Sequence, residues 1–101
     1  MPYIPQNQRE VIDSSIDKLV DNILDQNLQT SKVCGSLNYV ITRILMQTFL
    51  RKEGKISYGT VCMIDGIVSN IAREIYRRVA APYEDQKIIE NGDVKEFTNH
   101  E

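Results

Sequence analysis

The sequence predicts an all-α fold, a three-helix bundle with a short fourth helix after Pro82. Apolar residues recur at spacings of three and four in three long segments, and no segment alternates apolar and polar residues as a half-buried strand would. Of the 101 residues 42% are hydrophobic and 26% are charged, values typical of a globular domain. We therefore expect a single helical domain over residues 1–94, followed by a C-terminal tail, 95–101, that frays.

The first helix is expected from Asn7 to about Gln26, with an apolar stripe that runs through Ile16 and Ile23. Asn7 and Glu10 fit a capping box, in which each side chain bonds a free backbone N–H at the other end of the first turn. Asn27 favours a left-handed end to this helix. Alternatively, Pro5 opens the helix and moves its start by two residues.

The second helix is expected to begin after an N-cap at Thr30 or Ser31 and to end near Glu53, where Gly54 supplies the left-handed residue. Ser57 caps the third and longest helix, whose wide apolar stripe indicates a central helix or one that is also used in a dimer interface. The predicted core of the bundle consists of Ile16, Leu19, Val20, Ile23, Ile41, Ile44, Leu45, Val68, Ile71 and Ile75.

Pro82 either kinks the third helix or opens a new one, because proline lacks the N–H that an interior helical residue donates. As the first residue of a new turn it would be well placed, and the acidic pair Glu84 and Asp85 suits a helix N-terminus. Asn91 and Gly92 predict the end of this segment.

Charge and composition exclude several classes of function. The net charge of -2 gives no overall attraction to nucleic acid or to an anionic membrane, and no apolar run is long enough to span a bilayer. We expect a cytoplasmic protein in which Cys34 and Cys62 are buried thiols. The single histidine, His100, has no serine and aspartate arranged around it as in a catalytic triad, so we expect no enzyme and no cofactor.

Aspartates recur at steps of four residues along one flank of the first helix, from Asp13 through Asp17 and Asp21 to Asp25. A divalent-metal site of the kind found in all-helical nucleotide pyrophosphohydrolases would need acids on a second helix, usually in ExxE and ExxD pairs. Asp65 and Glu74, the nearest candidates on the third helix, are nine residues apart. The pattern favours a solvated acidic face or a basic partner over a metal site.

The one chemically distinctive surface is expected where the third helix ends. Arginine beside tyrosine suits the recognition of phosphate, carboxylate or bases, and a proline-fixed turn and an acidic run follow. The candidate binding residues are Tyr76, Arg77, Arg78, Tyr83, Glu84, Asp85, Asn91 and Asp93. The competing interpretation is structural, with Arg78 bridging to an acid such as Glu84, Asp85 or Asp93.

Several motifs resemble one family of short uncharacterised proteins of bacteriophages and bacteria. They are the Met-Pro-Tyr-Ile start, Gly-Ser-Leu-Asn-Tyr-Val-Ile-Thr over 35–42, Tyr-Arg-Arg over 76–78, Pro-Tyr-Glu-Asp-Gln-Lys over 82–87 and Glu-Asn-Gly-Asp-Val over 90–94. The resemblance covers nearly the whole chain and implies a phage or bacterial origin, without an activity. One departure is Lys95, which stands where relatives usually carry tyrosine.

These observations predict a small non-enzymatic interaction protein, phage-encoded and acting on a host or phage macromolecule, with a protein as its partner. Two alternatives remain open. One is a nucleotide- or phosphate-binding protein related to all-α pyrophosphohydrolases, with the arginines holding phosphate and the aspartates holding magnesium. The other is a structural homodimer subunit. Nucleic-acid and membrane partners are not expected.

Overall fold

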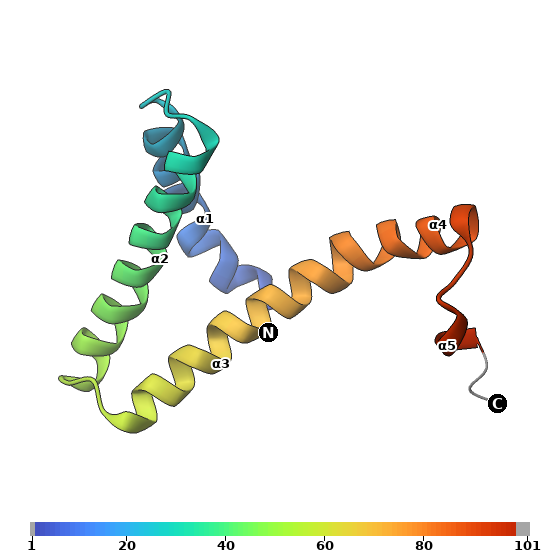
Figure 1. The fold of residues 1–101 in the computed structure, drawn as a ribbon. Helices are drawn as coiled ribbons and strands as arrows, with labels where there is room; N and C mark the ends of the chain where they lie inside the picture. Colours follow the sequence, from blue (N-terminus) through green and yellow to red (C-terminus); the bar gives the residue numbers. More distant parts are fainter. Residues whose placement is uncertain (1, 99–101) are drawn as a thin grey trace. The chain divides into compact units, whose positions relative to one another are not determined.

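The computed structural model describes residues 2–98, so His100 lies outside the described residues. The fold is all-α, as predicted, with α1 (Gln6–Leu24), α2 (Thr30–Glu53), α3 (Tyr58–Ile75), the π-helical turn η1 (Tyr76–Ala80), α4 (Ala81–Asn91) and the short α5 (Lys95–Thr98) (Figure 1). The chain divides into two compact units, an N-terminal unit, Pro2–Asp65, and a C-terminal unit that begins at Gly66. The tail that was expected to fray thus begins with α5, and residues 99–101 lie outside the described part.

The start of α1 is set by Pro5, and the predicted capping box does not form. Pro5 is the N-cap, with an extended backbone (φ -56°, ψ 149°), and no side chain caps the helix. The Pro5 carbonyl oxygen instead accepts hydrogen bonds from the backbone N–H groups of Gln8 and Arg9, at 3.0 and 3.2 Å. Because the helix already begins at Gln6, Asn7 lies inside its first turn and cannot act as the cap.

The predicted N-cap of α2 at Thr30 or Ser31 is also wrong, because Gln29 is the N-cap, no side chain caps the helix, and Thr30 is already helical. Three other predictions at helix ends are confirmed. Asn27 has a positive φ of 55°, and Gly54 adopts the left-handed conformation with φ 80° while its N–H donates to the Leu50 carbonyl oxygen at 2.9 Å. Ser57 caps α3: its Oγ accepts the Thr60 N–H at 3.2 Å, and Thr60 Oγ1 accepts the Ser57 N–H at 3.2 Å. This reciprocal pair satisfies two donors that the helix itself leaves free.

Pro82 does not break the helix, because the turn before it widens. α3 continues through η1 into α4 without an interruption (Figure 1). In η1 the Ala81 N–H donates to the carbonyl oxygen of Tyr76, five residues back. A regular α-helix would press the Pro82 ring against the Arg78 carbonyl, and the wider turn relieves this conflict.

The predicted core is mostly exposed in the single chain, and this corrects the sequence interpretation. Within the described residues Ile23, at 7% exposure, is the one buried apolar side chain, and Leu19 and Leu45 are half-buried. The other predicted core residues are exposed: Ile16, Val20, Ile41, Ile44, Val68, Ile71 and Ile75. Helical spacing identified the apolar stripes, but most of their side chains are exposed.

The burial predicted for the cysteines is also wrong. Cys34 and Cys62 are free thiols, but both are exposed. Among the described residues, no helix combines the length and the apolar character that crossing a membrane requires.

Candidate functional site

The π-helical turn η1 carries the first three predicted binding residues, Tyr76, Arg77 and Arg78. Arg77 is held by Glu74, one turn earlier: its Nη2 donates to Oε1 at 2.6 Å and its Nε donates to Oε2 at 3.2 Å. This bidentate ion pair is exposed to solvent. It therefore fixes the orientation of the Arg77 guanidinium but contributes little to the stability of the fold. The ion pair of this segment is thus formed by Arg77, and the predicted bridge from Arg78 to Glu84, Asp85 or Asp93 is not found among the described residues.

Tyr76 reaches forward to α4. Its hydroxyl group donates a hydrogen bond to the Glu84 carboxylate, and this bond is the largest cause of a raised pKa of the Tyr76 phenol. The negative charge of Glu84, slight desolvation and the charge of Asp85 raise that pKa further. The structure thus brings together three residues that the sequence analysis selected, Tyr76, Glu84 and Asp85.

The contact between Tyr76 and Glu84 predicts that the Tyr76 phenol loses its proton at a higher pH than an ordinary tyrosine. A phenol whose folded-state pKa lies above its ordinary value of 10.0 stabilises the fold below that pH, and the contribution is lost as the pH rises through the folded-state pKa. In a pH titration of the tyrosine ring signals by NMR, Glu84→Gln should move the pKa of Tyr76 down towards 10.0. Glu90→Gln, on the same helix, should leave it raised. An unchanged Tyr76 titration in Glu84→Gln would contradict the contact.

α4 fixes the next tyrosine by a different contact. The Lys87 Nζ atom lies 5.5 Å from the centre of the Tyr83 ring, and it also forms an ion pair with Glu90 Oε2 at 3.1 Å. Both pairs join residues one turn apart on the helix surface. Lys87 therefore covers one face of the Tyr83 ring, while the tyrosine side chain as a whole stays exposed.

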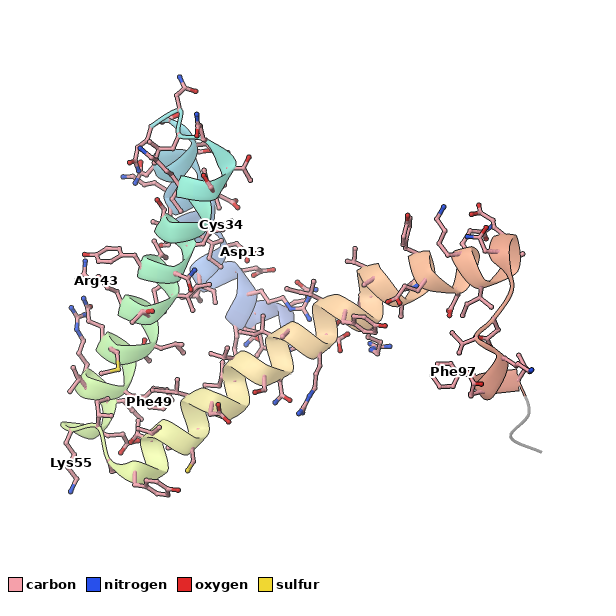
Figure 2. All side chains as sticks on the ribbon, viewed as in Figure 1. Asp13, Cys34, Arg43, Phe49, Lys55 and Phe97 are labelled. Atoms are coloured by element: carbon pink, nitrogen blue, oxygen red, sulfur yellow. The ribbon has the colours of Figure 1, made fainter. Side chains whose placement is uncertain are left out.

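A groove lies where α4 turns into α5, and we call it the α4–α5 groove. Gly92, with φ 88°, ends α4, and its N–H donates to the Ile88 carbonyl oxygen at 2.8 Å. Asp93 Oδ1 accepts the Val94 N–H at 2.7 Å, which fixes the connection to α5. The groove has a volume of about 340 Å³ and is lined by Glu84, Lys87, Ile88, Asn91, Gly92, Asp93, Val94 and Phe97. Phe97, labelled in Figure 2, is the α5 residue of this lining.

The predicted site residues thus fall into two groups. Glu84, Asn91 and Asp93 line the α4–α5 groove, whereas Tyr76, Arg77, Arg78, Tyr83 and Asp85 are outside its lining. Glu84 joins the two groups, because it bonds Tyr76 and also lines the groove. The sequence analysis missed the apolar part of the groove, Ile88, Val94 and Phe97, and the cation at Lys87. The spacing of four residues between Tyr83 and Lys87 was the available signal for the ring contact.

The metal interpretation receives no support from the geometry. Among the described residues, no group of three or more histidine, cysteine, aspartate or glutamate side chains could hold a metal ion. The aspartates of α1 follow one another along a single helix flank, and an oxygen-ligand site needs carboxylates that converge on one point.

The chain belongs to the family described as Domain of unknown function (DUF6899), whose family model matches residues 1–94. The match includes every candidate binding residue and all of the groove lining except Phe97. Comparison with curated proteins and with solved structures gave no match.

Proposed function

We propose that this member of a family of unknown function is a small non-enzymatic helical protein that binds a protein partner through the α4–α5 groove and the adjoining Tyr76 and Tyr83. We further propose that it is encoded by a phage and acts on a host or phage macromolecule in the cytoplasm. The observation that carries the proposal is the groove itself, whose lining combines exposed apolar side chains with the carboxylates of Glu84 and Asp93.

The apolar part of the groove supports binding. Ile88, Val94 and Phe97 line it from α4, the connection and α5, and all three side chains are exposed. Apolar side chains in a concave site gain free energy when a partner's side chain removes them from water.

Charge indicates the chemistry of the partner. From Ala81 to Thr98 five carboxylates (Glu84, Asp85, Glu90, Asp93 and Glu96) stand against two lysines (Lys87 and Lys95), a net charge of -3. A groove with apolar side chains in a segment of net negative charge suits a protein segment that combines aliphatic side chains with lysine or arginine. The same charge opposes a phosphate-bearing ligand, and the Arg77 guanidinium is already paired with Glu74.

Photo-crosslinking from a tyrosine position tests this surface directly. A photoreactive phenylalanine analogue replaces Tyr83 in the C-terminal unit or, as the matched control, Tyr58 at the start of α3; both tyrosines are exposed, at 64% and 86%. In irradiated host cells the Tyr83 position should give a discrete crosslinked protein, identified by mass spectrometry, that the Tyr58 position does not give.

A further substitution ties that crosslink to the groove. Ile88→Asp should reduce the Tyr83 crosslink at least tenfold, because it places a charge among the apolar side chains of the groove, whereas Ile89→Asp changes an exposed neighbour outside the lining and should preserve the crosslink. Equal crosslinking from Tyr58 and Tyr83, or a crosslink indifferent to Ile88→Asp, would contradict the proposed function.

A further inference from the structure

The N-terminal unit, Pro2–Asp65, exposes two apolar stripes that we call the α1–α2 stripes. They consist of Ile12, Ile16 and Val20 on α1 and Leu37, Ile41 and Ile44 on α2. Ile16, in the middle of the α1 stripe, and Ile44, at the end of the α2 stripe, are 51% and 52% exposed. Burial of apolar surface is the main favourable term in folding, and Ile23 alone supplies little of it. Apolar side chains of this spacing, exposed within the N-terminal unit, are typical of a surface that a partner covers.

The charges of the two helices identify which chain. α1 carries four carboxylates (Glu10, Asp13, Asp17 and Asp21) against two bases (Arg9 and Lys18), a net charge of -2. α2 carries four bases (Lys32, Arg43, Arg51 and Lys52) against the single acid Glu53, a net charge of +3. One surface therefore presents an acidic helix and a basic helix, and it is complementary to a second copy of itself.

Among the described residues, the charged side chains of α1 and α2 form no ion pair. The ion pairs of the described residues join Glu74 to Arg77 and Lys87 to Glu90, and neither involves α1 or α2. Aspartates at steps of four along α1 repel one another, which an opposing basic helix would relieve. Arg43, labelled in Figure 2, is one of the basic residues of α2. Its guanidinium lies 5.8 Å from the centre of the Tyr39 ring, and both residues line a groove of about 320 Å³ between α1 and α2.

We infer that the α1–α2 stripes are covered by a second copy of this chain, in a two-fold homodimer that places α1 of each copy against α2 of the other. The apolar stripes supply the buried surface, and the aspartate flank of each α1 meets the basic residues of the opposite α2. This inference is independent of the proposed function, because it concerns only the N-terminal unit.

Charge reversal and mixing test the pairing. The full chain should sediment with twice the mass of one 11.6 kDa chain. An α1-reversed variant (Asp13→Lys with Asp17→Lys) and an α2-reversed variant (Arg43→Glu with Arg51→Glu) should each dissociate at least tenfold more readily, since each faces like charge with like. When the two variants are mixed, both interfaces pair opposite charges again, and a heterodimer should form at equal stoichiometry.

Mixing separates contacts between chains from contacts within one, because a second chain cannot repair repulsion inside the first. A matched apolar pair adds an independent readout: Ile16→Asp should give a monomer, and Val11→Asp, at a position 78% exposed on the same helix, should remain a dimer. The inference is overturned if the unaltered chain is a monomer at all concentrations, or if the reversed variants stay homodimeric and do not exchange. A complex of the chain with a different protein alone would also overturn it.

Discussion

Replacing Ile23 by alanine should lower the free energy of unfolding by about 2 to 5 kcal/mol, the range found when a buried isoleucine is truncated. Ile23 is the one apolar side chain that is buried among the described residues, and it lies on α1 where that helix packs against α2. The loss combines the transfer free energy of the removed methyl groups with the cavity that remains. Urea unfolding followed by far-UV circular dichroism measures it.

Val11→Ala is the control for this experiment, because Val11 lies on the same helix with its side chain 78% exposed. Alanine has the higher helix propensity, so the control should leave stability unchanged or raise it by a few tenths of a kcal/mol. If the two variants unfolded at the same urea concentration, the packing of α1 on α2 around Ile23 would be wrong.

Gly54→Val should destabilise the chain by about 1 to 2 kcal/mol, because the residue would keep a left-handed backbone that a β-branched side chain strongly disfavours. Gly54 has φ 80° and closes α2 through its N–H bond to the Leu50 carbonyl oxygen. A Cβ atom would meet nothing within 4 Å, so the cost arises from the backbone and not from a collision. Thermal unfolding by calorimetry measures the difference.

Gly35→Ala provides the matched glycine substitution inside the same helix. A Cβ atom at Gly35 also meets nothing within 4 Å, and Gly35 has no positive φ. Alanine there should raise stability by up to about 1 kcal/mol through its higher helix propensity. Destabilisation by Gly35→Ala together with tolerance of Gly54→Val would contradict the assigned end of α2.

The helices were predictable where single residues determine the backbone locally. Asn27 and Gly54 occupy positive φ, and Ser57 bonds the first turn of α3, each as its residue type predicts. The failure at Asn7 has an equally local cause, because the Pro5 carbonyl had already begun the helix. At Pro82 sequence alone left a kink and a new helix as alternatives, since a widened turn depends on hydrogen bonds of the preceding residues.

The core could not be predicted, because spacing tells which residues share a helix face and not what covers that face. Ile16 and Ile23 belong to one stripe by their spacing, yet Ile23 is buried and Ile16 is exposed. Cys34 and Cys62 were placed inside on the average burial of cysteine, which assumes that the stripes beside them are covered. In the single chain that assumption fails.

The candidate site was predicted in part. The sequence located the surface at the end of the third helix and selected Tyr76, Glu84 and Asp85, which the structure joins. The sequence interpretation assigned an internal ion pair to Arg78. In the structure Arg77 pairs with Glu74 instead, and their spacing of three residues was visible in the sequence. Phe97 was not predicted as a site residue. It reaches the groove only after the chain turns at Gly92, and no local sequence pattern indicates that arrangement.

The proposed two-fold dimer covers the α1–α2 stripes of the N-terminal unit, which are exposed there, with a second copy of the chain. The most direct test is the midpoint of thermal unfolding of the unaltered chain as a function of its concentration. For a fold completed by a second copy, a hundredfold rise in concentration adds about 2.7 kcal/mol to the stability of the associated state, so the midpoint should climb steadily. A midpoint that stays constant over that range would contradict the account.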